Sequence, residues 1–173
     1  GRDFESFPLA SKIHFEFPAK GRRPAVKMTW YDGGLLPERP QMIENGRQMG
    51  DNDGGVLIVG TRNTLMHGVY GRDPHLIPET KNLEYQKPAP TMARSPGIYQ
   101  EWIDAIKDRS KVTTSSFEYA ARLTETMLLG NIALLREGER AVLEYDGANM
   151  RFTNDEAANA YLEKDYRPGF GLV

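Results

Sequence analysis

Apolar and polar residues alternate in two segments near the start of the chain, residues 12–17 and 25–31. An alternation of period two is typical of a half-buried β-strand. The residues on the apolar side are Ile13, Phe15, Phe17, Val26, Met28 and Trp30. A connection rich in Pro and Gly separates the two segments, so the pattern predicts an antiparallel hairpin.

The middle of the chain has a second pair of short apolar runs after a polar loop. The loop follows Asp32, and the runs cover residues 55–60 and 64–70. Three residues separate the runs, which predicts another hairpin. Residues 71–95 contain several prolines and few apolar residues, so we expect an irregular, extended crossing. A long ordered loop of this kind is a candidate surface for a ligand or partner.

The second half of the chain is predicted to be helical. Ser95 as N-cap and Pro96 as first helical residue open a helix that ends near Arg109. Ser115 and Glu118 form a capping box for a longer helix that runs to Gly138. The residues expected on its apolar face are Phe117, Ala121, Thr124, Leu128, Asn131 and Leu135.

The C-terminal part combines a hairpin and a helix. Residues 140–145 and 150–153 are predicted strands around an Asp-Gly turn, and Thr153 with Glu156 caps a final helix to about Tyr166. Strands that precede helices favour an α+β fold with a mainly antiparallel open sheet and helices packed on one face. We expect residues 1–173 to form a single domain.

Composition and charge exclude several classes of protein. The 173 residues include no cysteine, so thiol catalysis and disulfides are excluded, and both a cytoplasmic and a periplasmic location are compatible. No segment has the roughly 20 apolar residues of a membrane span. The net charge of -2 argues against nucleic-acid partners, and we expect no membrane insertion.

Motifs for cofactor binding and catalysis do not stand out. No glycine-rich loop follows a strand and opens a helix, and no Gly-x-Ser-x-Gly occurs. The three histidines are too scattered to suggest a metal site. We expect His14 to be solvated and His67 to be a buried structural residue, with a general acid or base as the alternative. His75 is expected to be the most exposed histidine and a ligand contact.

The aromatic residues divide into two groups. Trp30 and Trp102 lie on apolar stripes and are predicted to be core residues, although aromatic rings can also stack on sugars. Tyr31 and Tyr99 are the better candidates for a ligand contact.

Several sequence blocks in the same order resemble a known family. The blocks are PAVKMTWYDGGLLP (24–37), QEWIDAIK (100–107), LTETMLLGNIAL (123–134), LEYDG (143–147), FTNDEA (152–157) and YRPGF (166–170). Together they resemble the C-terminal domain of bacterial NAD(P)-dependent oxidoreductases of the Gfo/Idh/MocA type. The resemblance covers nearly the whole chain.

The resemblance implies half of an enzyme. In the family, an N-terminal Rossmann domain carries the glycine fingerprint and the catalytic lysine, and the C-terminal domain shapes the substrate pocket and builds the oligomer. The chain begins with Gly1, and we expect it to be a piece of a longer two-domain enzyme. We expect this piece to hold no catalytic residue and no cofactor, and to be inactive alone.

For the intact enzyme, the resemblance implies NAD or NADP, a sugar or polyol substrate, and a homo-oligomer formed through the open sheet face. The alternative hypothesis is a stand-alone carbohydrate- or protein-binding module without redox activity. A third hypothesis is a hydrolase that uses nicotinamide transiently to cleave glycosides.

Six residues are candidates for substrate contacts. Some family members place a histidine near the start of the helix that matches residues 98–107, where Arg94 or Tyr99 could substitute in this chain. Both lie near a helix N-terminus, which favours hydroxyls and anions. For Tyr99, packing against the sheet is an equal alternative. The other candidates are Asp32, Arg39, Arg72 and His75.

Overall fold

The structure is a computed structural model that describes residues 6–138 and 142–171. Its contacts divide the chain into two compact units. The first unit combines Gly1–Leu35 with Ser95–Val173, and the second is Leu36–Arg94.

The first unit opens with the predicted hairpin. Strand β1 (Lys12–Phe17) pairs antiparallel with β2 (Val26–Tyr31), and Ile13 lies opposite Trp30. Because side chains alternate along a strand, the apolar residues of both strands share one side. The predicted hairpin is therefore confirmed.

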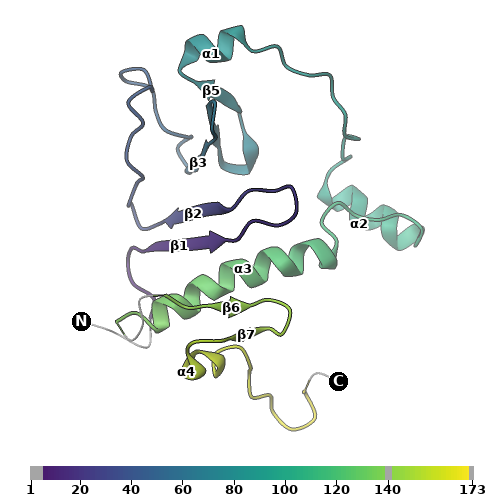
Figure 1. The fold of residues 1–173 in the computed structure, drawn as a ribbon. Helices are drawn as coiled ribbons and strands as arrows, with labels where there is room; N and C mark the ends of the chain where they lie inside the picture. The colour runs from purple at the N-terminus through teal and green to yellow at the C-terminus, as the bar shows by residue number, and fades with distance from the viewer. Residues whose placement is uncertain (1–5, 139–141, 172–173) are drawn as a thin grey trace. The chain divides into compact units, whose positions relative to one another are not determined.

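Helix α3 (Phe117–Leu135) begins one residue later than the predicted capping box of Ser115 and Glu118, because the N-cap is Ser116, whose hydroxyl accepts a hydrogen bond from the Tyr119 amide. It runs alongside the β1–β2 hairpin (Figure 1). Gly130 is buried there, and a Cβ at this position would come within 3.0 Å of the Phe15 ring. The absence of a side chain at Gly130 allows the helix to approach β1 closely.

The predicted apolar face of α3 is wrong in part. Phe117 is 94% exposed and Leu128 is half exposed, whereas Gly130 and Ile132 are buried. The reason is that the helix is contacted from two sides, so its buried residues do not follow one stripe. Gly130 faces the β1–β2 hairpin, and Ile132 packs on the C-terminal elements.

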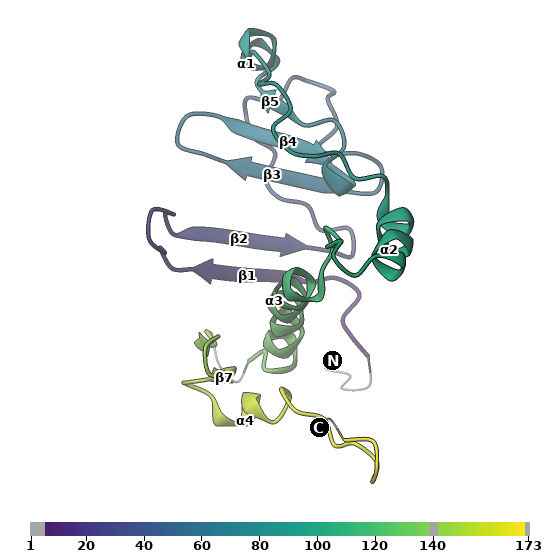
Figure 2. The same cartoon turned by 90° about the vertical axis from the view of Figure 1, so that its right-hand side faces the viewer.

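Those C-terminal elements are a two-stranded ladder and a short helix. Strand β6 (Tyr145–Asp146) pairs antiparallel with β7 (Arg151–Phe152), and α4 (Glu156–Asn159) follows. Figure 2 shows them on the other side of α3 from the β1–β2 hairpin. The core between them contains Ile132, Phe152 and Ala158.

The predicted hairpin of this region is confirmed in its turn, but the strands are shorter. Residues 140 and 141 lie outside the described residues, and 142–144 are not in a strand.

The Tyr145 hydroxyl donates to the Glu125 carboxylate at 2.6 Å, and burial together with this bond raises the pKa of Tyr145 to about 12.

The predicted final helix is also wrong in its bounds. Asp155, not Thr153, is the N-cap, because its carboxylate accepts the Ala158 amide. The helix then ends at Asn159, whose side-chain amide accepts from the Phe152 amide and donates to the Phe152 carbonyl. These bonds tie the end of α4 to β7.

Helix α2 (Ile98–Lys107) begins two residues later than predicted. Gly97 is its N-cap, with φ of 112°, and Ser95 accepts a hydrogen bond from the Gly97 amide instead of capping the helix. The predicted core position of Trp102 is wrong, because its side chain is 63% exposed.

The second unit contains a three-stranded antiparallel sheet in the order β3–β4–β5. The strands are Gly55–Val59, Thr64–Gly68 and His75–Ile77, and a 3-10 helix, η1 (Val69–Gly71), follows β4. The predicted hairpin of β3 and β4 is confirmed. The core contains Ile43, Met66 and Ile77.

The expectation of an irregular crossing over residues 71–95 is only partly correct. The segment contains β5 and a short helix, α1 (Glu79–Glu84). A three-residue strand is too short to show alternation. It forms because β4 offers a free edge, along which Met66 pairs with His75.

The fold is α+β, as predicted, and the described strands pair antiparallel. They lie in three small sheets rather than in one continuous sheet. No helix in the described parts of the chain is both long and apolar enough to cross a lipid bilayer.

Gly33 is a position where the backbone excludes a side chain. Its φ is 62°, and a Cβ there would lie 2.0 Å from the Leu9 carbonyl oxygen. Gly34 also has a positive φ, of 90°, but a Cβ there would meet open space. An alanine at Gly34 would therefore suffer backbone strain alone, whereas an alanine at Gly33 would suffer both backbone strain and steric overlap.

We predict that G34A lowers the free energy of unfolding by about 1–2 kcal/mol, the usual cost of a left-handed alanine. G33A should cost about 1–3 kcal/mol more, because the Leu9–Ala10 segment must also move. Urea denaturation of both variants tests this, and equal losses would contradict the steric argument.

A buried ion pair connects the end of α3 with the start of α4. Arg136 donates from Nε and Nη2 to the Asp155 carboxylate at 3.0 and 3.3 Å, and the Asp155 side chain is only 6% exposed. The pair Arg151–Glu156 is nearby in sequence but exposed, at 3.9 Å.

We predict that D155A lowers the free energy of unfolding by about 3–5 kcal/mol, because it leaves a partly buried guanidinium without its partner and removes the N-cap of α4. R151A serves as the matched control and should cost under about 1 kcal/mol. Chemical denaturation measures both. A D155A loss no greater than that of R151A would rule out a structural role for the buried pair.

Candidate functional site

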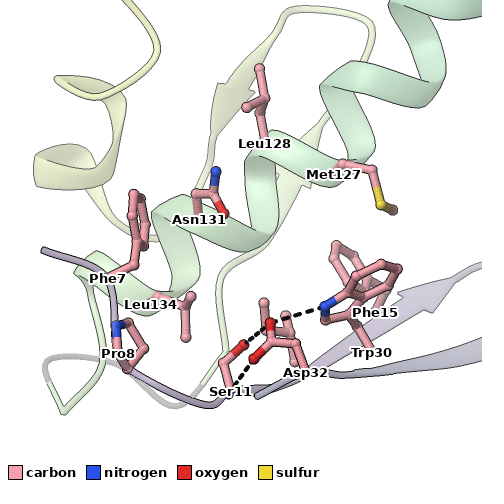
Figure 3. Close-up of a pocket in the computed structure, with 11 residues that line it drawn as sticks. Phe7, Pro8, Ser11, Phe15, Trp30, Asp32, Met127, Leu128, Asn131 and Leu134 are labelled. Carbon is pink, nitrogen blue, oxygen red and sulfur yellow. Dashed lines mark hydrogen bonds between the residues drawn. The ribbon is translucent and has the colours of Figure 1, made fainter. Parts of the chain in front are cut away.

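A pocket of about 360 Å³ lies in the first unit between the β1–β2 hairpin and α3 (Figure 3). Its size is within the range of small-molecule sites. The residues that line it are Phe7, Pro8, Ser11, Ile13, Phe15, Trp30, Asp32, Met127, Leu128, Asn131 and Leu134. The pocket is therefore mostly apolar, with a small polar group at the open end of the hairpin.

This polar group is centred on the Asp32 carboxylate. Oδ1 accepts the Ser11 amide at 2.5 Å, and Oδ2 accepts the Ser11 hydroxyl at 2.7 Å and the Trp30 indole N–H at 3.0 Å. Figure 3 shows the three side chains together below α3. All the donors are neutral, so the carboxylate keeps its full negative charge.

The strand register explains why these residues meet. Ser11 immediately precedes β1 and Asp32 immediately follows β2, and the Asp32 amide donates to the Ser11 carbonyl at 3.1 Å. Trp30 is two residues before Asp32, so both side chains project from the same side of the strand. The same side carries Ile13 and Phe15, which line the pocket.

Hydrogen bonding lowers the pKa of Asp32 below its ordinary value. The Ser11 hydroxyl is the main cause, the Ser11 amide and the Trp30 indole act in the same direction, and desolvation opposes them. Asp32 is consequently ionised at neutral pH. A carboxylate of low pKa is a poor proton acceptor, so the site is suited to binding and orienting hydrogen-bond donors rather than to general base catalysis.

Helix α3 forms the opposite wall. Met127, Asn131 and Leu134 recur at helical spacing and face the pocket. Within the described residues, the Asn131 side chain makes no hydrogen bond, so its carbonyl and its NH₂ group are available to a ligand.

The structure places only one of the six predicted site residues in this pocket, namely Asp32. Tyr99 belongs to α2 and is 81% exposed, so the alternative that it packs against the sheet is wrong. The other four candidates belong to the second unit.

Two of those four are arginines with partners in their own unit. Arg39 donates to the Glu44 carbonyl at 2.7 Å. Arg72 lies 3.9 Å from Asp51 and 3.7 Å from Asp53. These contacts stabilise the loops of the second unit. They also leave fewer N–H groups of each guanidinium available to a ligand. Arg94 is exposed near the end of this unit.

The expectation that His75 is the most exposed histidine is wrong. It is buried in β5 at 9% exposure, and its Nδ1 lies 2.8 Å from the Asp73 carbonyl, whereas His14 is exposed. His67 is only partly buried, and its Nδ1 lies 2.7 Å from the Gly68 carbonyl; its structural role stays a prediction.

Sequence reasoning missed Ser11 and Asn131 as pocket residues and treated Trp30 as core. Trp30 is 47% exposed because one side of the hairpin is covered by α3 only in part. The observed register places Ser11 opposite Asp32, one step beyond the Lys12–Tyr31 pair, so a register derived for the predicted hairpin could have revealed Ser11. The hydrogen bond from the indole depends on tertiary geometry.

No protein-family model matches this chain, and no curated protein matches it either. Within the residues that the structure describes, no three His, Asp or Glu side chains are grouped so that they could hold a metal ion.

The polar group predicts a specific titration behaviour. Because the pKa of Asp32 is lowered in the folded state, its ionised form contributes stability above the unfolded pKa, and this contribution is lost as the pH falls through the folded value. We predict that S11A raises the pKa of Asp32 toward the ordinary value of about 4 and that W30F raises it less. NMR titration of the Asp32 carboxyl carbon measures the pKa. An unchanged pKa in S11A would contradict the assignment of Ser11 as the main cause.

Proposed function

We propose that this chain is the substrate-binding part of an NAD(P)-dependent oxidoreductase of the Gfo/Idh/MocA type that acts on a sugar or polyol. The pocket between the β1–β2 hairpin and α3 is the proposed substrate site. The observation that carries the proposal is an ionised carboxylate beside an exposed indole in an otherwise apolar pocket.

This combination suits a hydroxylated ring. A carboxylate offers about four acceptor positions, and Asp32 uses three of them within the protein, so Oδ1 can still accept a substrate hydroxyl. The Trp30 ring provides an apolar surface for the C–H face of a sugar. Across the pocket, Asn131 can both donate to and accept from further hydroxyls.

In this proposal the residues of the chain bind and orient the substrate. The nicotinamide, supplied by the rest of the intact enzyme, would exchange a hydride with a substrate carbon. Asp32 would hold the substrate by a hydroxyl adjacent to the reacting carbon, and the apolar walls of the pocket would limit the access of water. The acid/base group would also come from outside this chain.

Self-association is a further part of the proposal. Strand β3 is an edge strand with exposed Val56, Ile58 and Val59. Val56 and Ile58 lie two residues apart and so expose apolar side chains on one face of this sheet, which supports the homo-oligomer expected to form through the open sheet face.

Isothermal titration of the full 173-residue chain with myo-inositol and with glucose tests the proposed site. D32N should weaken binding about 10- to 100-fold, because a charge-assisted hydrogen bond is lost, and W30A should weaken it by a similar factor. W102A removes an exposed tryptophan outside the pocket and should bind like the unmodified chain. Binding of polyols that D32N and W30A leave unchanged would refute this site.

A further inference from the structure

We propose that the pocket selects substrates that carry an ammonium group, so that its substrate class is amino sugars or amino polyols rather than neutral or acidic ones. This inference rests on the proposed function and makes it more specific. It follows from the charge balance of the pocket and from the rings that line it.

The negative charge of the pocket is not compensated by any described residue that lines it. Asp32 is ionised, and its three hydrogen-bond donors, two from Ser11 and one from Trp30, are neutral. Among the described residues that line the pocket, none is cationic. A ligand cation would therefore meet a carboxylate without competing with a protein cation.

Four cationic side chains on β1, β2 and α3 and just after α3 contact other groups outside the pocket. Lys12 lies on the opposite side of the hairpin, with Nζ 5.5 Å from the centre of the Tyr31 ring. Lys27 is 2.9 Å from Glu16, also away from the apolar side. On α3 and at its end, Arg122 pairs with Glu118 at 3.8 Å and Arg136 with Asp155 at 3.0 Å.

Aromatic rings give a second reason to expect a cation. Phe7, Phe15 and Trp30 all line the same pocket. The faces of such rings attract ammonium groups, and the attraction grows when water is partly excluded. The Asp32 carboxylate beside these rings repels phosphate and carboxylate groups.

The hydrogen-bond geometry fits the same group. An ammonium has three N–H donors and no acceptor. Oδ1 of Asp32 has an unused acceptor position, and the Asn131 carbonyl on α3 supplies another across the pocket. The donors of a protonated amine would thus meet acceptors, and its carbon skeleton would lie against the apolar walls.

Ligands that share one sugar ring and differ in charge test the selectivity of the unmodified chain. At pH 6, isothermal titration compares glucosamine, which is charged, with N-acetylglucosamine and glucose, which are neutral, and with glucuronate, which is negative. We expect glucosamine to bind about tenfold more tightly than either neutral sugar, and glucuronate to bind most weakly. The preference should shrink at high salt.

The variant D32N should abolish the preference while the fold, followed by circular dichroism, is retained. W30L, which removes a ring but keeps the charge, should reduce the preference only in part. If glucose binds as tightly as glucosamine and D32N weakens both, ammonium selectivity is overturned and the proposed polyol site stands. If no sugar binds, or if D32N leaves every affinity unchanged, both the selectivity and the proposed site are overturned.

Discussion

The hydrogen bonds accepted by the Asp32 carboxylate are the interaction on which the pocket of the first unit depends. By accepting the amide and hydroxyl of Ser11, the carboxylate closes the open end of the β1–β2 hairpin, where strand pairing stops. By accepting the indole N–H, it orients Trp30. The same three bonds keep the carboxylate ionised. One side chain thus stabilises the local fold and supplies the charge that a ligand would meet.

Helix α3 converts the hairpin into a pocket. The helix can approach β1 because Gly130 has no side chain, and Ile13 and Phe15 occupy the space. Asn131, the residue after Gly130, and Leu134, about one turn further along α3, line the pocket and form its wall. The other side of α3 packs on Phe152 and its neighbours. A helix contacted on two sides has little freedom to move, which favours a pre-formed site.

Of the six residues predicted to contact a substrate, Asp32 lines the pocket of the first unit, and its role in binding stays a prediction. Charge and loop position selected Arg39 and Arg72, but both contact groups in their own unit. His75 was selected for exposure, and it is buried because it pairs with Met66 on β4. Charged residues in loops serve structural and binding roles equally well, so residue type and position alone do not separate the two.

Local sequence patterns were enough to predict the strands β1 and β2 from their alternation, the start of α3 to within one residue, and the α+β class. Tertiary structure decided which sides of α3 are covered, that α4 ends at Asn159, and that Trp30 lines a pocket. The difference lies in how far apart along the sequence the interacting residues are. Caps and alternation involve residues a few positions apart. The Ser11–Asp32 bonds join residues 21 positions apart, and the packing of Gly130 on Phe15 joins opposite halves of the chain, so only folding brings these groups together.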